Sequence, residues 1–150
     1  MAGAKVLSSS QDTTIQETID ELFPAPQSIL SYTDAVSSTV SLSQINSGHD
    51  LNDLELTVLK GELGVAENGA IWVQIDDLEH RSSLFICQHL VILLKKSTIV
   101  HHLHEAYDRI NFEGSDYGLF ISGPSKTADI EQALVIGAHG PRSCTVIVEG

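Results

Sequence analysis

The sequence has few aromatic residues, few basic residues and no long apolar run, and each scarcity argues against a class of function. Aromatic residues make up 5% of the chain, which leaves few rings on which bases or sugars can stack. Eight basic residues stand against 20 acidic ones, and the formal net charge of −12 repels nucleic acid and anionic membranes. The longest apolar run, Leu90 to Leu94, is far too short to span a bilayer, and no secretory signal is evident. We therefore expect a cytoplasmic protein.

Cysteine is also scarce. Cys87 and Cys144 lie in apolar surroundings without CxxC spacing or a His/Cys cluster, so we expect reduced thiols in the core. No iron-sulfur motif is present, which predicts no intrinsic cofactor and leaves redox chemistry to a partner. A helix over 99–110 would place His101 and His104 on one face as metal ligands, with His102 nearby. Two ligands from one helix need further partners that the sequence does not show, so we expect no metal site.

The sequence does contain enough aliphatic residues for a core, and its predicted strands alternate with predicted helices. Its 150 residues, 42% of them hydrophobic, suffice for one domain. Amphipathic helices are predicted over 99–110, with Ser97 or Thr98 as cap, and over 128–136. This alternation predicts an α/β fold with a mainly parallel sheet layered by helices, and buried strands 70–75 and 90–94 at its centre. Strand-like runs cover residues 70–75, 90–94, 117–122 and 144–148.

The N-terminal region gives weaker signals. Residues 1–14 are small and polar and are predicted to be a tail, whereas 15–22 have helical periodicity that ends before Pro24. Residues 28–52 predict irregular structure with one edge strand, and 51–64 fit either helix or strand. The predicted organisation is a tail and short helix over 1–27 followed by an α/β domain over 28–150.

Residues Gly123 to Thr127 connect a predicted strand with a predicted helix, the place where open α/β sheets bind ligands. Gly123 permits a sharp turn, Ser125 or Thr127 can cap the helix, and Lys126 adds positive charge near free backbone N–H groups. This composition predicts a site for a carboxylate or phosphate, with Asp129 able to orient Lys126. The alternative is an ordinary turn before a capped helix.

Two further segments contain candidate reactive groups. His139 and Gly140 follow the helix predicted over 128–136, at its opposite end from Gly123, so they need not share a pocket with Lys126. Glu67 lies among small apolar residues before a predicted central strand. A partly buried Glu67 would have a raised pKa and could act as acid, base or nucleophile, and the alternative is a solvated turn residue.

The long run ISGPSKTADIEQALVIGAHGPR, residues 121–142, resembles the signature of the LUD (lactate-utilization) domain family. The segments GVAENGAIWV (64–73) and QHLVILL (88–94) are also similar to it, so the resemblance covers about residues 51–150. The resemblance implies the fold of the NagB/RpiA/CoA-transferase-like group. The ligand-binding residues that we expect, from the chemistry of the two segments described above, are Gly123, Pro124, Ser125, Lys126, Thr127, Asp129, His139 and Gly140.

Three functional hypotheses follow. Type C members of the family act with iron-sulfur partner proteins in oxidising lactate to pyruvate, which implies a subunit that binds a small organic anion or a partner. Family I CoA transferases have a nucleophilic glutamate in a similar Glu-Asn-Gly segment, so Glu67 to Gly69 implies acyl transfer as the alternative. The third hypothesis is a scaffold without a ligand. A homo-oligomer is compatible with all three.

Overall fold

The computed structural model describes residues 3–10, 12–41, 43, 45, 47–74, 81–112, 117–128, 134–136 and 140–150. Its main sheet has the strand order β1-β11-β6-β3-β2, and every neighbouring pair in it is parallel. Parallel neighbours are joined by crossover connections and not by tight hairpins. The first and last strands of the chain, β1 and β11, lie side by side in this sheet. The strands are β1 (Lys5–Ser8), β2 (Ile29–Ser31), β3 (Leu56–Gly61), β6 (His89–Lys95) and β11 (Ser143–Glu149).

A second sheet has the order β7-β4-β5-β8. Its pairs β4–β5 and β5–β8 are antiparallel, and β4–β7 is parallel. Two more strands, β9 (Lys126–Ala128) and β10 (Leu134–Ile136), form an antiparallel ribbon. The strands of the second sheet are β4 (Leu63–Val65), β5 (Ala70–Gln74), β7 (Ile99–Val100) and β8 (Gly118–Ile121).

Helices cover part of this framework. Helix α1 (Ile15–Leu22) begins with a capping box, in which the Thr14 hydroxyl accepts from the Glu17 N–H and the Glu17 carboxylate accepts from the Thr14 N–H. Helices α2 (Ser83–Ile86) and α3 (Leu103–Arg109) are short. The 3-10 turns η2 (Gly48–Leu51) and η3 (Lys96–Thr98) lie in connections. No helix within the described ranges is long and apolar enough to cross a membrane.

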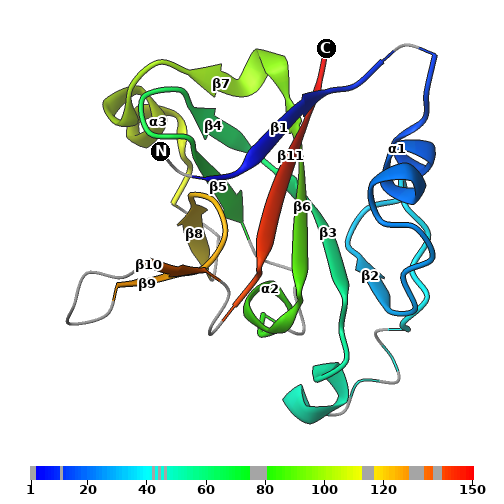
Figure 1. Cartoon of the computed structure of the whole chain (residues 1–150). Coiled ribbons are helices and arrows are strands. Elements are labelled where there is room, and N and C mark those ends of the chain that lie inside the picture. The colour runs from blue at the N-terminus through cyan, green and yellow to red at the C-terminus, as the bar shows by residue number, and fades with distance from the viewer. Residues whose placement is uncertain are drawn as a thin grey trace.

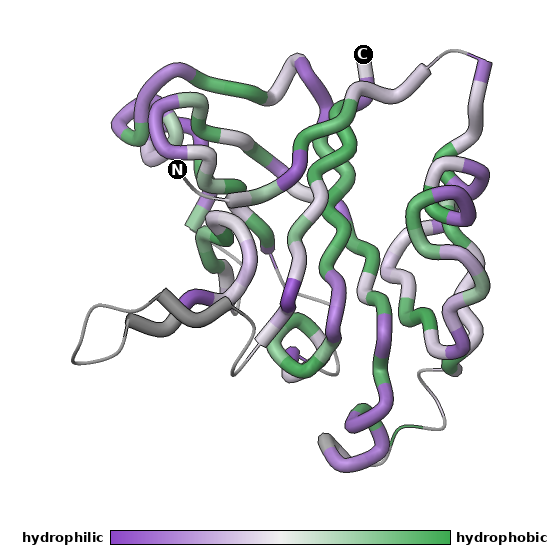
Figure 2. Tube along the Cα trace, viewed as in Figure 1, coloured by the Kyte–Doolittle hydropathy of each residue, from purple (hydrophilic) through white to green (hydrophobic). Residues whose placement is uncertain are grey.

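The core forms on both faces of the main sheet because alternate side chains of β6 and β11 point in opposite directions. On one face, Ile19 of α1 packs with Val91, Leu93 and Ile147. On the other face, Ile71 of the second sheet packs with a cluster that includes Ile92. Figure 1 shows α1 and the second sheet on opposite sides of the main sheet, and Figure 2 shows hydrophobic residues concentrated along the central strands.

The predicted α/β class with a mainly parallel sheet is therefore confirmed, as are helix 15–22 and the strands near 90–94, 117–122 and 144–148. The edge strand expected within 28–52 is β2. The tail prediction is wrong for Lys5–Ser8, which form β1 and pair with β11. Strand β5 is buried as expected, but its neighbours are antiparallel, because the second sheet and not the main sheet contains it.

Both predicted crossover helices are wrong in part. Ile99 and Val100 pair with Gly64 and Val65 as β7, so helix α3 begins only at Leu103. Ala128 and Leu134–Ile136 belong to the β9–β10 ribbon, whereas the rest of the helix predicted over 128–136 lies outside the described residues. Short segments with apolar residues three and four apart fit a helix and a ribbon equally well, and pairing with a neighbouring strand decides between them.

Candidate functional site

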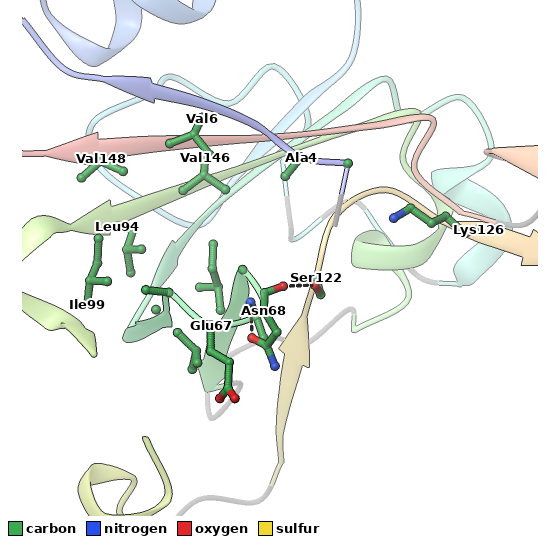
Figure 3. Close-up of a pocket in the computed structure, with 17 residues that line it drawn as sticks. Ala4, Val6, Glu67, Asn68, Leu94, Ile99, Ser122, Lys126, Val146 and Val148 are labelled. Atoms are coloured by element: carbon green, nitrogen blue, oxygen red, sulfur yellow. Dashed lines mark hydrogen bonds between the residues drawn. The ribbon is translucent and has the colours of Figure 1, made fainter. Parts of the chain in front are cut away.

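A cavity of about 880 Å³ lies over the face formed by β1, β11 and the last part of β6. Leu94, Val146 and Val148 form its apolar floor, and Val6 of β1 extends that floor. The opposite wall is the β4–β5 turn. The cavity runs along the sheet from Val148, near the carboxyl end of β11, to Lys126, which lies beside Gly3 near the amino ends of β1 and β11 (Figure 3).

The β4–β5 turn, residues 66–69, is held in place from both sides. On one side, the N–H groups of Ala66 and Glu67 donate to the carbonyls of Val100 and His101, at 2.9 and 3.0 Å. On the other, the Ser122 hydroxyl donates to the Asn68 carbonyl at 3.1 Å. Gly69 has φ 69°, a left-handed conformation that glycine adopts without strain. The turn is therefore a fixed wall that joins β7 to the end of β8.

Glu67 lies on this turn, but its side chain is exposed. Its carboxylate accepts a hydrogen bond from the Leu103 N–H at 3.1 Å, which satisfies one of the unpaired donors at the start of α3. Figure 3 shows the carboxylate pointing away from Lys126 and from the valines of the floor. The expectation of a partly buried Glu67 is therefore wrong, because the turn leaves its carboxylate exposed, and its catalytic role stays a prediction.

Lys126 brings the second predicted motif to the same cavity. It begins β9 and lines the cavity together with Ser122, Asn68 and Gly3. Gly3 lies against it so closely that a Cβ there would be 3.3 Å from the Lys126 Nζ. Lys126 therefore lies at a cavity, and its role in binding an anion stays a prediction. No helix begins at Ser125 or Thr127, so the capping role expected of those two residues is wrong.

Of the rest of the predicted loop, Gly123, Pro124 and Ser125 are not among the described lining residues of the cavity. Gly123 has φ 81°, which gives the turn expected there, and Pro124 is buried. The Ser125 N–H donates to the Pro141 carbonyl at 3.0 Å. A Cβ at Gly140 would lie 2.9 Å from the Cβ of Ser125.

This packing corrects the expectation that the two glycine-containing segments lie at opposite ends of a helix. Gly140 and Pro141 lie directly beside Ser125, since the chain returns through the β9–β10 ribbon. Two members of the predicted ligand-binding set, Asp129 and His139, lie outside the described residues. Thr127 lies within β9.

The cysteines lie in the core, as predicted. Cys87 and Cys144 are both buried free thiols, and burial raises the pKa of each to about 11. The Gly123 backbone lies near the Cys144 thiol and lowers its pKa slightly against the effect of burial, so the loop and β11 are neighbours. A thiol with a raised pKa is a poor nucleophile at neutral pH, so a catalytic role is disfavoured for either residue.

Within the part of the chain that the structure describes, no three His, Cys, Asp or Glu side chains are grouped to hold a metal ion. His101 and His102 precede α3, and only His104 lies inside the helix. The helical spacing that suggested paired ligands is therefore absent.

Sequence comparison identifies the family. A sequence model of the LUD domain matches residues 4–148, nearly the whole chain. The chain belongs to the LUD domain family. This result confirms the resemblance seen in residues 121–142 and extends it to the N-terminal region, where β1 completes the main sheet.

Curated relatives of this LUD domain share the printed name lactate utilization protein C. The protein of Shouchella clausii is 32% identical over 94 residues, 59% of this chain and 41% of the relative. That of Macrococcus caseolyticus is 34% identical over 93 residues, 58% of this chain and 40% of the relative. The protein named lactate utilization protein C 1 from Bacillus mycoides is 33% identical over 102 residues, which are 63% of this chain and 44% of the relative. The matched part thus spans less than half of these relatives.

A solved structure supports the fold. The crystal structure of a DUF162 family protein from Deinococcus radiodurans superposes with a TM-score of 0.69 at 18% identity, covering 99% of this chain and 90% of that one. The match over nearly the full length supports the α/β fold.

Sequence reasoning missed the apolar half of the site. Asn68 and Ser122 lie next to predicted motifs, but Ala4 and Val6 were assigned to a tail. The alternation of Val146 and Val148 along β11 places both on one face, and only the pairing with β1 identifies that face as part of a cavity.

Proposed function

We propose that this LUD domain serves lactate utilization, as a cytoplasmic subunit that binds a small organic anion in the cavity at Lys126. The observation that supports the proposal is the convergence of Lys126, Ser122 and Asn68 on one cavity with an apolar floor. The printed names of the curated relatives support lactate utilization as the process.

The charges of the cavity favour an anion. Lys126 and Glu67 are the only charged side chains among its described lining residues, and the Glu67 carboxylate is turned toward α3. Lys126 is exposed, and its ammonium group is the one positive charge among the described lining residues. Asn68 and Ser122 are the uncharged polar side chains of the described lining, and we assign them to the hydroxyl or keto group of a small acid.

Oxidation of lactate to pyruvate removes two electrons and two protons, and an acceptor must take the electrons. The chain has two cysteines, whereas the common iron-sulfur clusters are held by four cysteine thiolates. We therefore assign the clusters to iron-sulfur partner proteins. In this scheme the chain holds the acid or its product beside a partner that conducts the electrons.

The test is a thermal-unfolding screen of the purified chain with lactate, pyruvate and acetate. A ligand present at about 100 times its Kd stabilises the protein by about 2.7 kcal/mol. For a chain of this length that is a rise in Tm of roughly 5–10 °C. Lys126→Ala is expected to abolish the shift. Lys60→Ala, which removes an exposed lysine of β3 outside the cavity, is the matched control and should leave it unchanged.

A second variant separates the alternatives. Glu67→Gln should keep the shift, because the carboxylate does not point at the anion. A covalent Glu67 adduct with an acyl-CoA, seen by mass spectrometry, would instead support acyl transfer. If no acid shifts the Tm of the unmodified chain, the anion site is refuted, and an unchanged pull-down of iron-sulfur proteins by Lys126→Ala would favour the scaffold.

A further inference from the structure

The cavity is several times larger than a three-carbon acid requires. One water molecule takes about 30 Å³ of liquid volume, so the six heavy atoms of lactate fill roughly 180 Å³ at most. The cavity measures about 880 Å³. Sites of about 300–1,000 Å³ usually enclose a drug-sized molecule or a cofactor, so lactate alone would leave most of this space to water.

The unfilled part of the cavity is apolar because the second sheet stops short of one edge of the main sheet. Over β6, that sheet covers Ile92 and Leu94 with Ile71. Over β11 and β1 the cover ends. Val148 is only partly buried, and Val6, on the neighbouring strand, is 64% exposed. Exposed β-branched side chains that continue a core face favour an apolar occupant.

Polar and apolar groups separate along the cavity. Figure 3 shows Lys126 at one end, Asn68 and Ser122 between, and Leu94, Ile99 and Val148 at the other end. The Glu67 carboxylate lies outside this line, directed at α3. A ligand that matches the separation has one anionic end and an unbranched or flat apolar body.

We propose that the cavity binds amphipathic monocarboxylates, with the carboxylate at Lys126 and an aliphatic chain laid over Val146, Val148 and Ile99. The inference rests on the anion site of the proposed function and extends its ligand class beyond three-carbon acids. Transfer of the aliphatic chain of the ligand from water to the apolar end provides most of the affinity. Lys126 fixes the orientation of the ligand by binding its carboxylate. An aldehyde or alcohol of the same length lacks the charge and loses the contribution of Lys126.

Isothermal titration with acetate, butyrate, hexanoate and octanoate, each below its micelle concentration, tests this proposal. Each buried methylene should increase the affinity by about two- to fourfold until the chain fills the cavity. Hexanol and octanol serve as uncharged probes. In Lys126→Ala, octanoate should bind no tighter than octanol.

The chain offers a matched pair of variants for the apolar end. Ile99 and Ile86 are exposed to nearly the same extent, 38% and 37%, but only Ile99 lines the cavity. Ile99→Ser should weaken octanoate severalfold and leave acetate unchanged, whereas Ile86→Ser should leave both unchanged. Val6→Thr, a substitution of nearly equal shape on the exposed β1 strand, should weaken octanoate as well.

The outcomes distinguish this inference from the proposed function. If lactate raises the Tm but affinity does not increase with chain length, the inference is overturned and the anion site stands. Equal effects of Ile99→Ser and Ile86→Ser overturn it too. If octanoate binds and lactate does not, the inference holds and the lactate-binding role fails.

Discussion

Replacement of Gly118 by alanine tests the packing that holds the second sheet together. Gly118 lies in β8, on the same face as Phe120, and the Trp72 ring of β5 lies across it. A Cβ at Gly118 would lie 2.1 Å from Cζ2 and 2.4 Å from Cη2 of Trp72. Both carbons belong to a rigid ring of a residue that is only 8% exposed, so the ring must move out of the core.

The magnitude follows from two opposing contributions. Overpacking of a core costs about 1–3 kcal/mol, and a clash with ring carbons belongs at the upper end. Glycine to alanine lowers the entropy of the unfolded chain and returns about 0.4–1 kcal/mol, because Gly118 does not have a positive φ. The net loss is about 2 kcal/mol, which for a chain of this length lowers Tm by roughly 4–8 °C.

A double-mutant cycle with Trp72→Phe isolates the clash. Phenylalanine lacks the outer ring atoms that meet the new Cβ, and it also removes the buried Trp72 Nε1, which has no hydrogen-bond partner among the described residues. Gly118→Ala should therefore cost little when it is combined with Trp72→Phe. Urea unfolding followed by far-UV circular dichroism measures all four proteins. Additive effects within about 0.5 kcal/mol, or a more stable Gly118→Ala, would refute the reasoning.

Two predictions concern titration. Burial raises the pKa of Cys87 and Cys144 to about 11, so these thiols lose their protons at lower pH in the unfolded chain than in the folded one, and the folded protein should lose stability as pH rises from 9.0 toward 11. Neither thiol should react with a thiol reagent at pH 8 until denaturant is added. Rapid labelling of native protein would contradict this. Burial, with a smaller contribution from Arg142, lowers the pKa of His89 below 6.5 against the attraction of Glu55. Stability should therefore fall as pH drops below 6.5, and His89→Gln should reduce that slope in urea titrations at about pH 5–7; an unchanged slope would exclude His89 as its source.

The parts of the fold that could be predicted from sequence are those in which side chains alone determine the structure. Strand β6 has buried residues on both faces, and α1 shows an amphipathic pattern with a capping box, so both follow from local sequence. The long run over 121–142 indicated the family, which the match over 4–148 confirms. That run did not reveal the local structure of its own residues, which include the β9–β10 ribbon.

The errors have a common physical cause. Strand β1 is exposed in three of its four residues, and it forms because its backbone pairs with β11, a contact that leaves no hydrophobic pattern. Ile99 and Val100 fit a helix face equally well, and their pairing with β4 decides otherwise. Strand β5 is buried on both faces in an antiparallel sheet because α3 covers the side that faces away from the main sheet, so burial alone did not distinguish parallel from antiparallel neighbours.

The same reasoning explains why the site combines one predicted half and one unpredicted half. The polar half contains Lys126 and Asn68, whose residue types indicate chemistry wherever they lie. The apolar half exists only through contacts between segments far apart in sequence, since Gly3 packs on Lys126 and β1 pairs with β11. Because the cavity depends on this pairing, its volume follows from topology, whereas the preference for an anion that we propose depends on a single lysine.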